Sequence, residues 1–133
     1  MAPTARFLIP LLALTLVGAA CSDDAPAVEF GEGEVPPAFP DDFPIPEGAQ
    51  IGTTLIDRVN TRSEFNMTVA SVVSGAAQFF SVELVSDGYV IDSSEGTDSD
   101  WSIEFTRGDL DGSIRILLIG EGVVSATVEI NDA

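Results

Sequence analysis

The chain has 133 residues, of which 22 are Asp or Glu and five are Arg, so its formal charge at pH 7 is −17. It contains no lysine and no histidine. Binding of nucleic acid and of anionic lipid headgroups relies on Lys and Arg, so this charge argues against both. The missing histidine removes the usual general base and the commonest metal ligand.

The first 20 residues have the pattern of an export signal. Arg6 precedes an apolar segment from Phe7 to Val17, and the small residues Gly-Ala-Ala follow at 18–20. The apolar run ends after about 14 residues, whereas a helix that crosses the hydrocarbon of a bilayer needs about 20. We therefore expect residues 1–20 to be removed as a signal peptide rather than kept as a transmembrane helix.

The run LVGAAC, which ends at Cys21, resembles the lipobox of bacterial lipoproteins. The resemblance implies cleavage between Ala20 and Cys21, lipid (including palmitate) on Cys21, and anchorage in the cell membrane facing the extracytoplasmic side. Gly18 departs from the family, which usually has a larger aliphatic residue at this position. The alternative is an ordinary signal peptide that is cut after Ala20 and leaves a free thiol. Cys21 is the only cysteine, so a disulfide has no second partner in the chain.

Residues 21–40 are rich in Pro, Gly and acids, with only isolated apolar residues. Such a composition buries too little apolar surface to order the chain, so we expect an acidic flexible tether. A single domain is then expected over 41–133. The motif FPIPEGA, from Phe43 to Ala49, resembles the start of small exported bacterial domains of unassigned role.

The pattern inside the domain predicts strands around one helix. Alternation predicts strands over 50–59 and 64–70, where Phe65, Met67 and Val69 share a face. Residues 71–87 are expected to form the helix, although 79–85 also alternates in part, as a strand would. Ser71 or Ser74 is the expected N-cap, and Gly88 the left-handed residue that ends the helix.

Four short strands are expected after the helix, near 89–92, 101–106, 113–119 and 124–130. In the second of them, Trp101, Ile103 and Phe105 face the core. Residues 113–119 are apolar on both faces, which predicts a central strand with one side under the helix. The links are too short for parallel crossovers, so we expect an α+β fold: an antiparallel sheet of about five to six strands with one helix packed on one face.

Candidate sites are few. Asp109-x-Asp111-Gly112 resembles the middle of a calcium-binding loop, but Arg107 and Leu118 stand where its first and last ligands belong, so a hairpin turn is favoured. Asp98 and Asp100 lie in a second acidic loop that is a weak candidate for a cation site. Arg115 is expected to pair with an acid or cover the sheet edge.

The residue types indicate that the protein is not an enzyme and uses no cofactor. The leading hypothesis is a lipoprotein whose domain is a monomeric binding or interaction module for an unknown envelope protein. The alternative is a protein that binds a cation or small ligand through its acidic loops.

Overall fold

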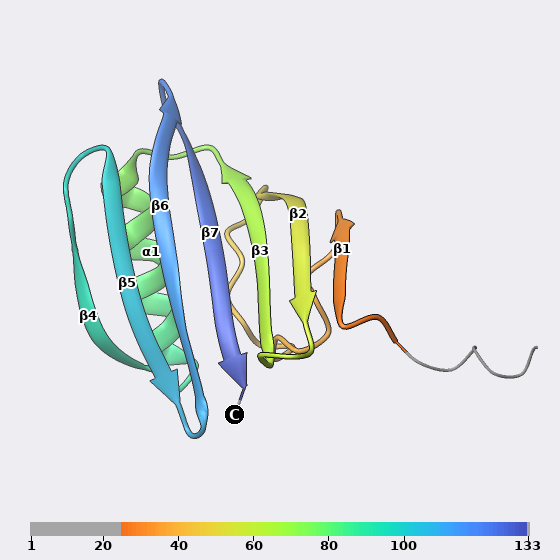
Figure 1. Cartoon of the computed structure of the whole chain (residues 1–133). Coiled ribbons are helices and arrows are strands. Elements are labelled where there is room, and N and C mark those ends of the chain that lie inside the picture. Colours follow the sequence, from red (N-terminus) through yellow and green to blue (C-terminus); the bar gives the residue numbers. More distant parts are fainter. Residues whose placement is uncertain (1–24, 133) are drawn as a thin grey trace, which may run out of the picture.

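The computed structural model describes residues 25–132, and Figure 1 shows them as one sheet with a helix behind it. The elements are β1 (Val28–Glu32), β2 (Gln50–Asp57), β3 (Arg62–Val69), α1 (Val73–Ser86), β4 (Val90–Gly96), β5 (Asp100–Arg107), β6 (Leu110–Gly120) and β7 (Val123–Asp132). The strand order is β1-β2-β3-β7-β6-β5-β4, and every neighbouring pair is antiparallel.

This architecture confirms the predicted α+β class and the antiparallel sheet with one helix on one face. The sheet has seven strands rather than five to six, and β1 is the strand that the sequence did not predict. Short connections explain the pairing, because β5 and β6 are separated only by Gly108 and Asp109, and such a link allows only a hairpin.

The segment before β2 differs from the predicted flexible tether. Residues 28–32 form an edge strand whose Phe30 pairs with Leu55 of β2, and Phe39 is only 4% exposed. The ring of Phe39 packs edge-on against Phe43 at 5.3 Å and against Phe65 of β3 at 4.8 Å between centroids. Composition did not reveal this order, because it depends on a hydrophobic surface that lies far away in the chain. Residues 21–24 of the predicted tether, with Cys21, lie outside the described residues.

Two different elements therefore cover one face of the sheet. Helix α1 packs over β4, β5 and β6, and the segment between β1 and β2 covers the other half of the same face (Figure 1). Phe43 joins the two halves, since its ring contacts both Phe65 and Phe105. The result is a single core under the helix side, while the other face of the sheet is turned toward solvent.

The predicted alternation is confirmed in the central strands. Phe65 and Met67 of β3 are fully buried, as are Val124, Ala126 and Val128 of β7. The residues between them along these strands are polar and lie on the opposite face, as the two-residue period of a strand requires. In β5, Ile103 and Phe105 are buried as predicted. Trp101 is half-buried against the same core and donates its indole N–H to Ser94 Oγ at 2.9 Å.

Helix α1 confirms the predicted helix and its end, but not its cap. The N-cap is Val72 without a side-chain hydrogen bond, and the Ser71 hydroxyl donates to the Val72 carbonyl instead. At the other end Gly88 has φ of +92°, and the Tyr89 N–H donates to the Leu84 carbonyl at 2.9 Å. This is the Schellman geometry that Gly88 predicted, and it turns the chain directly into β4.

Within residues 25–132, the structure contains no helix that combines the length and the apolar character needed to span a membrane.

Candidate functional site

The arginines of the described chain are all held in ion pairs. Arg58 pairs with Glu29, Arg62 with Glu129, Arg107 with Asp42 and Arg115 with Asp100, at N–O distances from 2.8 to 3.2 Å. Three of these pairs join segments that are far apart in the sequence, and the Arg115 pair joins β6 to β5. The pairing expected for Arg115 is therefore present. The four ion pairs connect different segments of the fold.

Arg107 makes the most contacts of the four. Its guanidinium donates to both Asp42 carboxylate oxygens, at 3.0 and 3.3 Å, and to the Asp87 carbonyl at the end of α1 at 3.0 Å. It also lies 4.3 Å from the centroid of the buried Tyr89 ring. The helix has no basic residue in its own last turn, so Arg107 of β5 supplies the positive charge that a helix C-terminus favours. One side chain thus ties the N-terminal segment, the helix and the sheet together.

The Asp42–Arg107 pair predicts a pH-dependent stability. The hydrogen bond from Arg107 lowers the pKa of Asp42 below its ordinary 3.8, so the folded chain keeps this carboxylate ionised to lower pH than the unfolded chain. The resulting stabilisation is present above about pH 3.8 and is lost as the pH falls through the lower folded pKa. We expect Asp42→Asn to lower the melting temperature at pH 7, and the difference from wild type to vanish toward pH 2.

Thermal melts of wild type, Asp42→Asn and the control Asp41→Asn across this pH range check the prediction. Asp41→Asn removes the same charge from the neighbouring position. Asp41 itself forms no ion pair among the described residues, unlike Asp42. Repulsion from the other acids changes by a similar amount in both variants. The difference between their melting temperatures therefore reports the Asp42–Arg107 pair. If Asp42→Asn lowers the melting temperature as much at pH 2 as at pH 7, the prediction is wrong.

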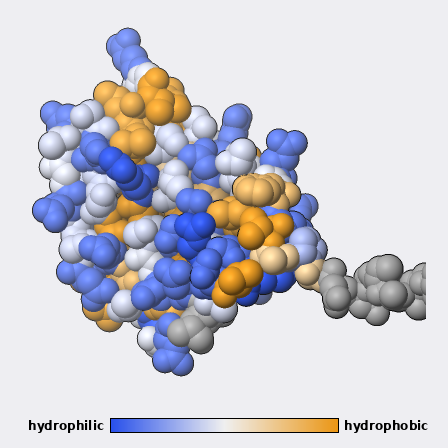
Figure 2. Space-filling view, in the orientation of Figure 1, coloured by the Kyte–Doolittle hydropathy of each residue, from blue (hydrophilic) through white to orange (hydrophobic). Residues whose placement is uncertain are grey.

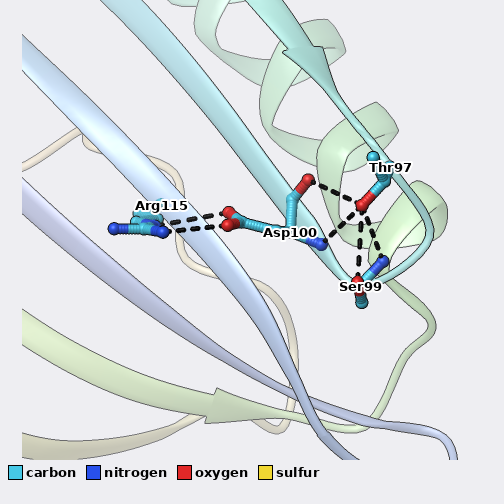
Figure 3. Close-up of polar contacts among 4 residues, drawn as sticks. All are labelled: Thr97, Ser99, Asp100 and Arg115. Atoms are coloured by element: carbon cyan, nitrogen blue, oxygen red, sulfur yellow. Dashed lines mark hydrogen bonds and ion pairs between the residues drawn. The ribbon is translucent and has the colours of Figure 1, made fainter.

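The four weak metal candidates do not form a site. Figure 3 shows that the Asp100 carboxylate is taken by Arg115, which donates from Nε at 3.3 Å and from a terminal nitrogen at 2.8 Å. These hydrogen bonds lower the pKa of Asp100. Thr97 Oγ accepts the backbone N–H groups of Ser99 and Asp100, so the acidic loop is a compact turn.

Asp109 and Asp111 are not brought together with that loop. Asp109 lies in the two-residue turn between β5 and β6, and Asp111 lies in β6 opposite Thr106. The hairpin turn favoured by the sequence is therefore observed. Among residues 25–132, no group of three or more Cys, Asp or Glu side chains is arranged to hold a metal ion.

Asp111 does line a shallow acidic hollow on the helix-free face. The hollow has a volume of about 320 Å³, and three further carboxylates, those of Asp92, Glu104 and Glu129, line it. Two of the four are already engaged, because Arg62 donates to Glu129 and Ser93 donates to Glu104. The hollow concentrates negative charge but offers a cation few free oxygens.

The feature that the sequence did not predict lies at the end of β6. Leu117, Leu118 and Ile119 are 37%, 44% and 57% exposed, although residues 113–119 were expected to form a central strand with one side under the helix. Only the first half of this segment is buried, at Ile114 and Ile116. The pairing with β5 ends at Leu117, opposite Asp100, so the last residues of β6 project beyond that neighbour.

A bulge shapes the same end of the strand. Leu118 pairs with Val124 and Gly120 with Val123, which leaves Ile119 as the extra, unpaired residue of β6. Bulges of this kind re-aim a side chain and raise the local twist. The only signal in the sequence was the run of four consecutive apolar residues, 116–119, directly before the Gly120-Glu121-Gly122 turn, which breaks the period of two.

We call the exposed apolar residues at this end of the molecule the tip patch: Val72, Leu117, Leu118 and Ile119, with Leu117 on the face of the sheet opposite to that of Leu118. Val72 and Leu118 face a groove of about 420 Å³ beside the start of α1, and Asp98 and Glu121 are among its lining residues. Figure 2 shows hydrophobic atoms gathered at this upper end of the molecule, over the β6–β7 turn of Figure 1. An apolar centre with polar residues at its edge is the usual composition of a protein-binding surface.

Neither a family model, nor a curated protein, nor a solved structure matches this chain.

Proposed function

We propose that the protein is a membrane-anchored extracytoplasmic lipoprotein whose domain is a non-enzymatic binding module. In this proposal Cys21 carries the lipid, and the tip patch binds another component of the cell envelope. The observation that carries the binding role is the exposure of Leu118 and Ile119 on a strand end that projects from the sheet.

The tip patch is difficult to explain as part of the fold. Leu118 and Ile119 are about half exposed, whereas Ile114 and Ile116 of the same strand are completely buried. Apolar side chains left in water at this strand end cost solvation free energy that a partner would recover, at about 25 cal/mol per Å² covered. A partner surface with an apolar centre fits this patch, and basic groups at its rim would complement Asp98 and Glu121.

The anchor is supported by the sequence and is compatible with the described fold. The lipobox-like run ends at Cys21, and among the described residues the first with a hydrogen bond to the domain is Pro26, whose carbonyl accepts from Arg58. The non-enzymatic role is supported by the absence of histidine and lysine from the sequence. It is also supported by the ion pairs that occupy Asp42 and Asp100, since a paired carboxylate is a poor general base.

A photo-crosslinking residue in place of Ile119, expressed in the native cells, tests the binding role. We expect a discrete crosslinked adduct from position 119 and none from Val82, which is apolar and 55% exposed on the outer side of α1. Leu118→Ser in the same background should weaken the adduct about tenfold, because truncating a central contact costs more than about 1 kcal/mol. Equal crosslinking from positions 119 and 82 would refute the tip patch as the binding surface.

The acidic hollow keeps a second candidate function open, the binding of a cation, because four carboxylates line one surface. Calorimetric titration with calcium should then release or absorb heat and raise the melting temperature. Asp111→Asn should abolish that response, and Asp109→Asn, in the adjacent turn, should leave it intact. A melting temperature unchanged in millimolar calcium would retire this candidate.

A further inference from the structure

A second group of exposed apolar side chains lies where the described chain begins. Val28 and Phe30 of β1 are 43% and 78% exposed, and Val59 in the turn between β2 and β3 is 70% exposed. Val28 and Phe30 are two residues apart on one strand and therefore share a face. We call these three residues the base patch. Figure 2 shows hydrophobic atoms beside the point where the described residues start.

The first described residues are hydrogen-bonded to the domain next to this patch. Arg58 donates from its backbone N–H to the Ala27 carbonyl at 2.8 Å, and from its side chain to the Pro26 carbonyl at 2.8 Å. Val59 is the next residue after Arg58. The same guanidinium pairs with Glu29 at 3.1 Å, which neutralises the acid that lies between Val28 and Phe30 in the strand. One acid adjacent to the base patch is thus ion-paired.

The distance to the proposed anchor is short. Pro26 is five positions after Cys21, and an extended chain spans at most about 3.6 Å per residue, or about 18 Å. A domain held on so short a linker cannot move far from the lipid surface, and the part of it nearest the linker is the base patch. An exposed aromatic ring beside a lipid anchor is in the position where interfacial residues contact a bilayer.

We propose that the base patch rests on the membrane surface, with Phe30 inserted at the boundary between headgroups and acyl chains. This inference rests on the proposed lipid anchor at Cys21. The acyl chains hold the protein on the bilayer, and Phe30 fixes its orientation, so that the tip patch points away from the lipid. The acidic surface disfavours anionic headgroups, so the contact is expected on zwitterionic lipid.

The test uses the full lipidated protein in phosphatidylcholine vesicles. An environment-sensitive fluorophore is attached to a single introduced thiol at Phe30→Cys or, as a matched control, at Ile119→Cys of the tip patch. Spin-labelled phosphatidylcholine, with its nitroxide near the headgroups, should quench the probe at position 30 at least about twofold more than at position 119. With the probe at Val28→Cys, the additional change Phe30→Ser should remove most of the quenching.

Each other outcome decides against the inference in a distinct way. Protein that floats with the vesicles but shows equal quenching at positions 30 and 119 keeps its anchor and refutes the base contact. A probe signal at position 30 that depends on protein density, without spin-labelled lipid, indicates pairing with a second copy through β1 and refutes it too. Protein that does not float with the vesicles refutes the lipid anchor, and the inference falls with it.

Discussion

Replacing Phe39 by alanine should lower the free energy of unfolding by about 3–5 kcal/mol, the usual cost of removing a buried phenyl ring. Phe39 is 4% exposed and packs edge-on against Phe65 at 4.8 Å. Small domains are stable by about 5–15 kcal/mol, so this is a large fraction of the total. A loss of 3 kcal/mol already corresponds to more than about 10 °C in melting temperature.

The control is the same substitution at Phe30, whose side chain is 78% exposed. Surface changes of this kind usually stay within about 0.5 kcal/mol. Urea unfolding of both variants measures the difference. If residues 21–40 were a flexible tether throughout, Phe39→Ala and Phe30→Ala would melt together with wild type. That result would contradict the packing of the N-terminal segment over β3.

Replacing Cys21 by alanine should abolish acylation of the protein completely. Each methylene group buried in the bilayer contributes about 0.8 kcal/mol, so the lipid chains would dominate membrane binding. The cells are grown with an alkyne analogue of palmitate, and the label is detected on the purified protein. We expect label on wild type and on the control Ser22→Ala, and none on Cys21→Ala, which should accumulate as a larger precursor or be released.

Mass spectrometry of the mature N-terminus gives a second, independent measurement. An acylated N-terminal Cys21 is the expected species. An unmodified cysteine at this position would favour the ordinary signal peptide cut after Ala20. A chain that begins elsewhere would contradict both readings of residues 1–20. In either case the inference that the base patch contacts the membrane would fail, because no lipid on Cys21 would hold the domain near a bilayer.

The two apolar patches lie in different regions of one sheet. The base patch is proposed to contact the membrane, and the tip patch is proposed to bind a partner. The base patch lies on the edge strand β1, next to the residues where the described chain begins. The tip patch lies at the end of β6, four strands away in the sheet order. If both proposals hold, the domain presents a fixed surface to a partner above the membrane, and the polar face of the sheet between them stays in water.

Local patterns were sufficient for most of the secondary structure. The period of two in 64–70 and 124–130 predicted β3 and β7, because each of these strands has one fully buried face. Asp87-Gly88 predicted the end of α1, since only a residue that adopts positive φ at low cost can make this turn. The short links then required antiparallel neighbours, which determined the fold class.

Only the tertiary structure decided the role of residues 28–49, the partners of the arginines and the exposure of the tip. Phe39 looks isolated among Pro, Gly and acids, and its burial depends on Phe65, which is 26 positions later in the sequence. Arg107 finds Asp42 across 65 positions, and no local spacing encodes that contact. Leu118 and Ile119 have the composition of a buried strand, but they are exposed because the neighbouring strand β5 ends before them. Local propensity and period depend on adjacent residues, whereas burial and ion pairing depend on which distant segments meet.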